Sequence, residues 1–228
     1  MPRQIIVVGA SRGIGLKLVE LLAENQENHI LALSRNQKGM EKLLEHPNVE
    51  CAHFDLGGDS VKQQLTELTK NLDRVDVLIN NAGKLVNKPF PELQRADFLE
   101  SYQVNLFGVM ETVQALLPKM EQGCHIVNIS SMGGFQGSIK FPGLTAYSGS
   151  KAALCNFTEL FAEEYKESQI RMNCLCLGAV QTEMLEEAFP GYQAPLSAEE
   201  MAAYISWFAL QGGRYFNGKI LPVSLSTP

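Results

Sequence analysis

Short apolar runs alternate with amphipathic stretches along most of the chain. Seven runs have the length and content of buried strands, at residues 4–8, 29–33, 49–54, 75–79, 125–129, 171–177 and 219–223. Helical patterns lie between them, at about 16–24, 39–45, 59–72, 145–165 and 197–210. Strands that alternate with helices form parallel sheets through right-handed crossovers. The pattern therefore predicts an α/β fold with a doubly wound parallel sheet flanked by helices.

Two stretches depart from this alternation. Between residues 91 and 120 apolar side chains recur at helical spacing, which predicts either one long helix or a broken pair. Asn105 interrupts the apolar stripe, and a buried asparagine needs hydrogen-bond partners, most commonly from the backbone. Residues 178–195 follow no regular pattern, and we expect them to form a short lid over a binding site.

The composition is typical of a single globular domain. The chain has 228 residues, of which 45% are hydrophobic and 19% charged, and no linker divides it, so we expect one domain over residues 1–228. A net charge of -6 with scattered basic residues argues against a nucleic-acid partner. No apolar segment has the length of a secretion signal or a membrane span, which predicts a cytoplasmic protein without membrane contact.

The residue types that commonly bind metals show no ligand spacing. Five cysteines lie mostly in apolar runs without a C-x-x-C pair, and the four histidines are far apart in the sequence. We expect the cysteines to be reduced core residues. No metal site is predicted.

A glycine-rich loop follows the first strand. Gly9, Gly13 and Gly15 form the spacing G-x-x-x-G-x-G between a strand and a helix. Glycines at this place allow a tight turn and a close approach of the backbone, and the free N–H groups of the helix N-terminus attract an anion. The loop predicts a phosphate-binding cradle, with an ordinary turn as the alternative.

The end of the second strand bears on the choice of dinucleotide. In such folds this position meets the adenosine ribose, where a carboxylate binds the 2′-hydroxyl and an arginine binds a 2′-phosphate. The chain has Ser34-Arg35-Asn36 there, without an acid. Arg35, together with Arg12 of the glycine loop, favours NADP over NAD; the alternative is an exposed arginine without a role.

Tyr147 and Lys151 lie four residues apart in the helical pattern at 145–165. Residues at this spacing share one helix face, which sets an ammonium group beside a phenol. A nearby cation lowers the pKa of a phenol and makes it a better proton donor near neutral pH. The same spacing is common on exposed helix faces, so the motif depends on the rest of the chain for its meaning.

Several motifs occur together in one order along the chain. They are the glycine loop, Asp55, Asn81-Ala82-Gly83, Asn105, Ser131 and Tyr147-x-x-x-Lys151. In this order they resemble the classical short-chain dehydrogenase/reductase (SDR) family, over essentially the whole chain. The resemblance implies a single-domain, Rossmann-like sheet of about seven strands in the order 3-2-1-4-5-6-7.

The resemblance also implies catalytic roles. Tyr147 would donate a proton to a substrate carbonyl while hydride arrives from the nicotinamide, and Ser131 would hydrogen-bond that carbonyl. Lys151 would lower the phenol pKa and hold the nicotinamide ribose. Asn105 would hold a water that links Lys151 to solvent.

The same resemblance assigns the dinucleotide contacts. The residues expected to bind the cofactor are Gly9, Ser11, Arg12, Gly13, Ile14, Gly15, Ser34, Arg35, Asp55, Leu56, Asn81, Ala82, Gly83, Tyr147, Lys151, Gly178, Val180 and Thr182. Within this set Asp55 and Leu56 would flank the adenine, and residues 81–83 would contact the riboses. Thr182 would contact the carboxamide or phosphate side.

The chain departs from the family pattern at three places. Val8 stands where threonine is usual before the first glycine, a change we discount because that hydroxyl is chiefly structural. Leu177 replaces the usual proline after the sixth strand, which would loosen the turn beside the nicotinamide. The interval from Ser131 to Tyr147 is about three residues longer than is common, and we place the extra residues at 138–140, in a loop that tolerates insertions.

These features favour an NADPH-dependent reductase of a 3-oxoacyl thioester, ketone or aldehyde. Two alternatives stay open. One is an alcohol dehydrogenase in the oxidative direction, because the same groups serve both directions; the other is a sensor or scaffold that binds NADP without hydride transfer. The apolar faces of the stretches 97–120 and 145–165 exceed what one side of a sheet covers, so we expect a homodimer or homotetramer.

Overall fold

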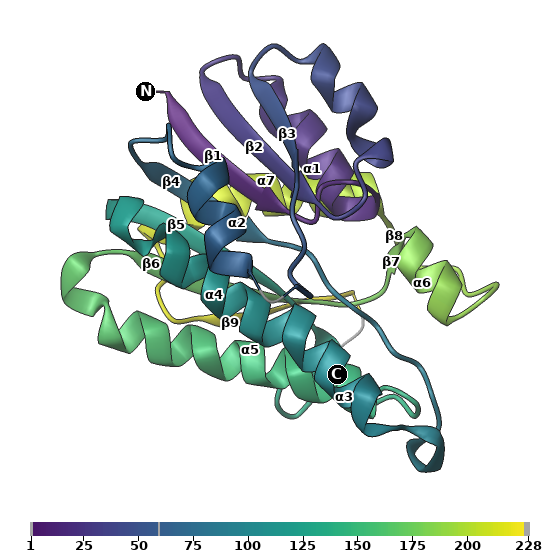
Figure 1. Ribbon diagram of the computed structural model, residues 1–228. Coiled ribbons are helices and arrows are strands. Elements are labelled where there is room, and N and C mark those ends of the chain that lie inside the picture. Colours follow the sequence, from purple (N-terminus) through teal and green to yellow (C-terminus); the bar gives the residue numbers. More distant parts are fainter. Residues whose placement is uncertain (1, 59, 226–228) are drawn as a thin grey trace.

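A parallel sheet of seven strands lies at the centre of the computed structural model, which describes residues 2–58 and 60–225 (Figure 1). The strands are β1 (Arg3–Val8), β2 (Asn28–Ser34), β3 (Val49–His53), β4 (Val75–Asn80), β5 (Met120–Ser131), β6 (Arg171–Leu177) and β9 (Ile220–Val223). They lie in the order β3-β2-β1-β4-β5-β6-β9, and every pairing is parallel. This confirms the predicted doubly wound, Rossmann-like sheet and its strand order.

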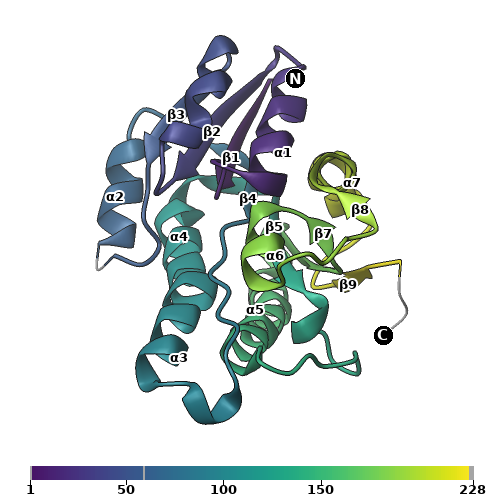
Figure 2. The same ribbon diagram turned by 90° about the vertical axis from the view of Figure 1, so that its right-hand side faces the viewer.

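Helices cover both faces of the sheet (Figure 2). One face carries α1 (Gly13–Ala23) and α7 (Ala198–Gln211), and the other carries α2 (Val61–Leu68), α4 (Gly108–Leu116) and α5 (Thr145–Glu164). Side chains alternate along β1, so that Ile5 and Val7 pack toward α1 while Ile6 and Val8 pack toward α2 and α4. Because both faces are buried, the strands read as continuous apolar runs. No helix within the described residues is both long enough and apolar enough to span a bilayer.

The stretch between residues 91 and 120 forms a broken pair of helices. α3 (Arg95–Tyr102) and α4 are joined by a π-helical turn, Gln103–Phe107, in which the N–H of Gly108 donates to the carbonyl of Gln103. Such turns insert one extra residue and are frequent at functional sites. This turn contains Asn105, whose side chain is buried.

The remaining elements are short. They are the 3-10 helices Lys38–Glu45, Phe90–Glu92, Leu117–Lys119, Met132–Gly134, Lys166–Ser168 and Gly212–Arg214, the helix α6 (Glu183–Ala188), and the two-residue strands β7 (Val180–Gln181) and β8 (Leu196–Ser197). The segment 178–195, expected to be irregular, thus contains a strand and a helix. Thr182 starts that helix, because its hydroxyl accepts a hydrogen bond from the N–H of Leu185 at 3.3 Å.

The predicted start of α7 is correct, and the predicted C-terminal end of α2 is wrong. α7 begins as predicted, because Ser197 caps it: Ser197 Oγ accepts the N–H of Glu200 at 3.1 Å, and the Glu200 carboxylate accepts the N–H of Ser197 at 2.8 Å. α2 is shorter than the predicted 59–72, because Thr69 leaves the helical conformation at φ -108° and ψ 11°. Asp59, the expected first residue of that helix, lies outside the described residues.

His125 ties β5 to α7 and β6. Its Nδ1 lies 2.9 Å from the carbonyl oxygen of Ala209, and its Nε2 lies 3.0 Å from Nδ2 of Asn173. Since the amide nitrogen of Asn173 can only donate, Nε2 accepts and the proton of the neutral ring is on Nδ1. Burial lowers the pKa of His125 to about 4.

We predict that His125 makes the free energy of unfolding depend on pH. The unfolded ring has a pKa of about 6.5, so the stabilisation is complete above that pH and is lost as the pH falls toward about 4. Between pH 7 and pH 5 the wild type should therefore lose about 2 kcal/mol more than His125→Gln does. Urea unfolding at both pH values measures this, with exposed His29→Gln as the matched control. Equal losses in the wild type and His125→Gln would contradict the prediction.

Candidate active site

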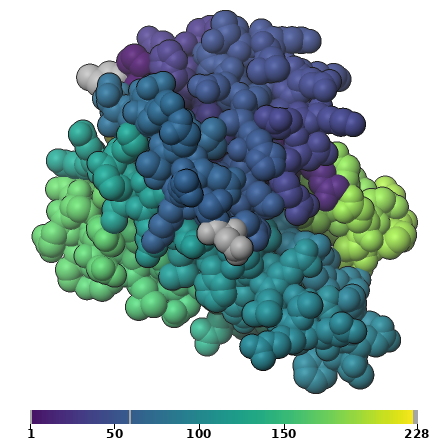
Figure 3. All heavy atoms as spheres, in the orientation of Figure 1, coloured from purple at the N-terminus to yellow at the C-terminus, as the bar shows by residue number. Residues whose placement is uncertain are grey.

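A cleft of about 870 Å³ opens at the carboxyl ends of the central strands. Its walls come from the glycine loop after β1, the ends of β2, β4, β5 and β6, and parts of α5 and α6. In the space-filling view the segment that contains α6 lies at the right-hand edge, against atoms of the N-terminal residues (Figure 3). All residues predicted to bind the cofactor line this cleft except Gly15, and Ser131 lines it too. Asn105 lies outside the lining, so the structure brings together nearly the whole predicted set.

Tyr147 and Lys151 lie on the buried face of α5. Tyr147 is 9% exposed and Lys151 is 3% exposed. The Lys151 ammonium lies 6.0 Å from the centre of the Tyr147 ring and donates a hydrogen bond to the carbonyl of Ile129 at 2.7 Å. The helix therefore holds phenol and ammonium on the same face, beside the end of β5.

The pKa values of these two side chains shift in opposite directions, and burial is the main cause of both shifts. Burial raises the pKa of Tyr147 to about 12, although a hydrogen bond with Ser131 acts to lower it. Burial lowers the pKa of Lys151 to about 8. The expected net lowering of the phenol pKa is absent in this arrangement, because desolvation outweighs the other effects, and the pKa-lowering contribution of the Lys151 charge stays a prediction. The phenol is thus protonated at neutral pH, as a proton donor must be.

Ser131 and its neighbour Ser130 have different tasks at the end of β5. Ser130 is buried, and its hydroxyl donates to the carbonyl of Lys151 at 3.0 Å. Ser131 is half-buried, accepts the N–H of Gly133 at 3.1 Å and interacts with the Tyr147 phenol. The hydroxyl beside the phenol is therefore that of Ser131, whose catalytic role stays a prediction.

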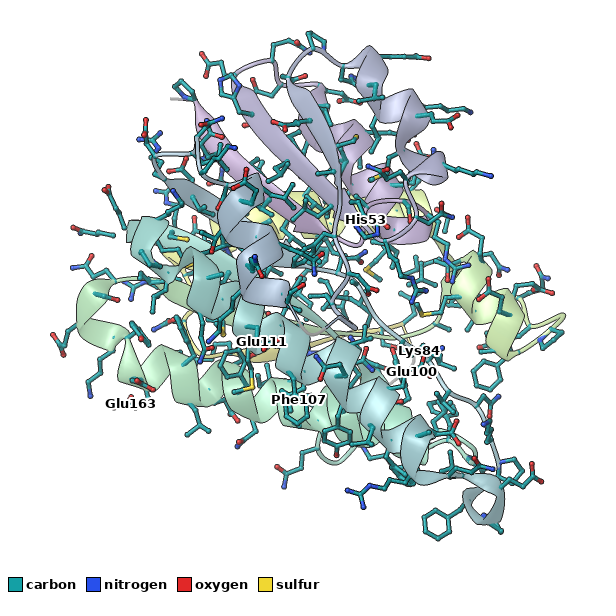
Figure 4. The ribbon with its side chains drawn as sticks, viewed as in Figure 1. His53, Lys84, Glu100, Phe107, Glu111 and Glu163 are labelled. Carbon is teal, nitrogen blue, oxygen red and sulfur yellow. The ribbon has the colours of Figure 1, made fainter. Side chains whose placement is uncertain are left out.

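Asn105 binds the loop after β4 to α5. Its Oδ1 accepts the N–H of Lys84 at 2.8 Å, and its Nδ2 donates to the Lys84 carbonyl and to Ser150 Oγ, both at 2.9 Å. The Lys84 side chain forms an ion pair with Glu100 of α3 at 2.7 Å, and the two side chains lie together in Figure 4. Asn105 therefore finds main-chain and side-chain partners, and its predicted water relay stays a prediction.

The glycine loop packs directly against the turn after β4. Gly9 has a φ of +91°, and a Cβ there would lie 2.6 Å from the backbone of Ala82. A Cβ at Gly15 would lie 1.9 Å from the carbonyl oxygen of Gly9. The Asn81 side chain donates to that same oxygen at 2.8 Å. Two loops that are far apart in the sequence thus form one main-chain wall of the cleft.

The residues expected near the adenosine lie at one end of the cleft. Ser34 Oγ donates to Ser11 Oγ at 2.8 Å, which joins the end of β2 to the glycine loop. Arg35 is exposed at the cleft edge. Asp55 is half-buried and accepts the N–H of Gly57 at 2.9 Å. This end of the cleft therefore presents a cation to solvent and no carboxylate on β2.

Arg12 contacts α6, which lies in the segment 178–195. Its guanidinium forms a two-pronged ion pair with the Glu187 carboxylate of α6, in which Nη2 and Oε2 are 3.1 Å apart. Hydrogen bonding from Arg12 lowers the pKa of Glu187. Glu183 of the same helix lies close to Gly13. In this structure the glycine loop is thus joined to α6, and the expected role of Arg12 at a 2′-phosphate stays a prediction.

Leu177 keeps the turn after β6 in place. It is 7% exposed and pairs with Val223 of β9. The N–H of Gly178 donates to the Val223 carbonyl at 2.9 Å, and a Cβ at Gly178 would lie 2.4 Å from Ser224 Oγ. Pairing with β9 therefore continues past the end of β6, and the expected loosening of the turn beside the nicotinamide stays a prediction.

The described geometry agrees with comparisons with known proteins. The family model for the short chain dehydrogenase matches residues 3–193. The chain belongs to the short-chain dehydrogenase/reductase family.

Individual relatives of this SDR differ in substrate and cofactor. The 3-oxoacyl-(acyl-carrier-protein) reductase of Aquifex aeolicus is 30% identical over 237 residues, which cover 96% of this chain and 94% of the relative. The solved 4-hydroxyisoleucine dehydrogenase complexed with NADH superimposes with a TM-score of 0.85 at 23% identity, over 97% of both chains. The NADP complex of RhlG from Pseudomonas aeruginosa gives 0.85 at 23% identity, over 97% of this chain and 94% of the other. These two structures support the fold alone.

The mouth of the SDR cleft is apolar, which the sequence motifs do not indicate. Its lining includes Ile139, Phe141 and Leu144 from the loop before α5, and Phe189 and Tyr192 from the segment 178–195. In the sequence, the sign of this apolar mouth is the presence of aromatic and aliphatic residues in stretches without regular periodicity. The residues that lengthen the loop form an ordered turn, in which the ammonium of residue 140 donates to two carbonyls and one hydroxyl.

Proposed function

We propose that this SDR reduces the carbonyl of an apolar substrate to an alcohol with NADPH as hydride donor. A 3-oxoacyl thioester, a ketone and an aldehyde are the candidate substrate classes. The observation that carries the proposal is the pairing of a protonated Tyr147 phenol with Ser131 on a cleft whose mouth is apolar. Such a site can hold a carbonyl oxygen between two hydroxyl donors.

The residues present fit a dinucleotide. Among the described residues no side chain caps α1, so its first N–H groups are free for an anion, as a pyrophosphate requires. A Cβ at Gly83 would lie 3.5 Å from both Lys151 Nζ and Asn105 Oδ1, so the glycine leaves space beside the ammonium. We assign the pyrophosphate to the glycine loop, the riboses to Lys151 and residues 81–83, and the adenine to Asp55 and Leu56. When bound, NADPH supplies the hydride.

The protein groups then have separate tasks. Ser131 donates a hydrogen bond to the carbonyl oxygen and holds it near the phenol. Tyr147 donates its proton to that oxygen as the alcohol forms. Lys151 stabilises the resulting phenolate by its positive charge. Asn105 keeps the loop after β4 fixed beside Lys151, and a water held there returns a proton.

We expect a preference for NADPH over NADH that depends on Arg35. A guanidinium–phosphate contact contributes roughly 1.5–3 kcal/mol, so Arg35→Ala should weaken NADPH binding roughly tenfold to a hundredfold and leave NADH binding unchanged. Calorimetry with both cofactors measures this. Lys38→Ala, an exposed cation on the following 3-10 helix, is the control. Equal affinities of the wild type for NADPH and NADH would refute the assignment.

The proposed activity is tested by a screen in both reaction directions, carbonyl reduction and alcohol oxidation. NADPH oxidation is followed with ketones, aldehydes and acyl thioesters, and NADP reduction is followed with alcohols. We expect turnover with an apolar carbonyl. Turnover with alcohols alone would favour the oxidative direction, and firm NADPH binding without turnover would favour a sensor or scaffold.

The proposed assembly is a homodimer or homotetramer in the cytoplasm, with a small-molecule substrate and neither a nucleic acid nor a membrane as partner. Large apolar side chains are exposed along α3 to α5, with Leu99 at 55%, Phe107 at 46% and Leu160 at 62%. Light scattering tests the assembly, and a monomer would refute it.

A further inference from the structure

Three cysteine thiols meet between α5 and β6, on the side of the catalytic lysine. Cys155 lies one helical turn after Lys151 on α5, and Cys174 and Cys176 are alternate residues of β6 that face this helix. The sulfur of Cys155 lies 3.5 Å from that of Cys176 and 3.9 Å from that of Cys174, and all three lie within 4.8 Å of one another. All three side chains are buried.

This spacing suits one metal ion. A metal–thiolate bond is about 2.3 Å long, so three sulfurs in a plane around one cation lie about 4 Å apart. The cluster therefore needs little movement to close around an ion. Met132 packs against it, and among the described residues no histidine or carboxylate joins it. A purely sulfur donor set selects soft cations over hard ones.

Charge also favours such a site. Lys151 lies one helical turn before Cys155 on α5 and is buried, and its ammonium interacts electrostatically with all three cysteines. A negatively charged metal–thiolate group would thus have a buried cation next to it.

We propose that Cys155, Cys174 and Cys176 form a binding site for one Cu(I) ion, and that its occupation lowers the turnover of the enzyme. Binding forms three Cu–S bonds and releases the protons of the three thiols, and no group is oxidised or reduced. The resulting group carries a charge of minus two. Cu(I) is the choice because the donor set is soft and because, among the described residues, no fourth histidine, cysteine or carboxylate completes the tetrahedral set of a structural zinc.

Ser130 joins this site to the cleft. The thiol of Cys155 donates to Ser130 Oγ at 3.4 Å, and Ser130 lines the cleft next to Ser131. A metal-bound thiolate has no proton to donate, so Ser130 would lose that bond and gain a charged acceptor in place of the Lys151 carbonyl. Binding of Cu(I) to the three cysteines would in this way disturb the positions of Ser131 and Lys151 together. This effect on turnover rests on the proposed reductase function, whereas binding of the ion does not.

The binding test uses the intact protein, reduced and without oxygen. Cu(I) is titrated against a chromogenic Cu(I) chelator, and X-ray absorption reports the ligands. We expect one ion per chain with three sulfur neighbours, retained in Cys51→Ser and lost in Cys155→Ser and in Cys174→Ala. Thermal unfolding shows that each variant folds. A stoichiometry unchanged by Cys155→Ser, no binding at all, or binding of Zn(II) as tight as that of Cu(I) would overturn the site.

The inhibition test compares turnover before and after loading. We expect a roughly tenfold or greater loss in the wild type and in Cys51→Ser, which the chelator reverses, and no copper-dependent loss in Cys155→Ser. Turnover unchanged by the bound ion would overturn the inhibitory half of the proposal. If no carbonyl substrate is found, the stoichiometry and the sulfur coordination still decide whether the site exists.

Discussion

Replacing Tyr147 by phenylalanine is expected to lower carbonyl reduction at least about a thousandfold and to leave NADPH binding within about twofold of the wild type. The phenol hydroxyl is the only group removed, and the ring remains to fill the buried wall of the cleft. For this variant we expect carbonyl reduction to be nearly abolished, while calorimetry still shows NADPH binding.

The matched control for this change is Tyr165→Phe. Tyr165 lies at the C-terminal end of the same helix, stacked on Phe161 at 4.4 Å, and does not line the cleft. Its loss of a hydroxyl should leave turnover unchanged. Reduction by Tyr147→Phe at more than a tenth of the wild-type rate would show that another group supplies the proton.

Replacing Lys151 by methionine should affect both turnover and binding. We expect a loss of at least about a hundredfold in kcat and roughly tenfold weaker NADPH binding, because the ammonium both stabilises the phenolate and binds a ribose. Lys166→Met, an exposed lysine just beyond α5, is the control. A Lys151→Met variant with normal kcat would contradict the role assigned to the ammonium.

The wild-type pH profile belongs to the same prediction. Lys151 has a pKa lowered to about 8, so its charge is present below that pH and is lost as the pH rises through it. The value of kcat/KM for reduction should therefore fall above about pH 8. The phenol, with a pKa raised to about 12, stays protonated across this range and adds no second inflection.

Local patterns were sufficient for the sheet and for most of the cleft. Alternating strands and helices determine a doubly wound sheet, and such a sheet brings the residues at its strand ends to one edge. That is why residues as distant as Gly9, Asn81, Ser131 and Gly178 line one cleft. The helical spacing of Tyr147 and Lys151 also predicted a shared face.

Features that depend on tertiary contacts were not predictable in this way. Asn105 in the π turn is bonded to Lys84 and Ser150, contacts that apolar periodicity does not reveal. The ion pair between Arg12 and Glu187 depends on where α6 lies relative to the glycine loop. The Tyr147 pKa depends on how far the ring is buried, which neighbours in sequence do not reveal.

The cysteine cluster illustrates the same limit. Cys174 and Cys176 have the two-residue spacing of one strand face, and Cys155 has the spacing that puts it on the face of Lys151. The three cysteine side chains come together only when α5 is packed on β6 in the observed register. Sequence spacing alone therefore predicted reduced core residues and no metal ligands.

The most direct test of the central claim follows the hydride. NADPH that carries deuterium at C4 of the nicotinamide, on the transferred face, is incubated with the best carbonyl from the screen, and the alcohol is analysed by mass spectrometry. We predict one deuterium on the former carbonyl carbon with the wild type, and at most about a thousandth as much alcohol with Tyr147→Phe in the same time. An alcohol without deuterium, or NADPH binding without an alcohol from any carbonyl tested, would contradict the account.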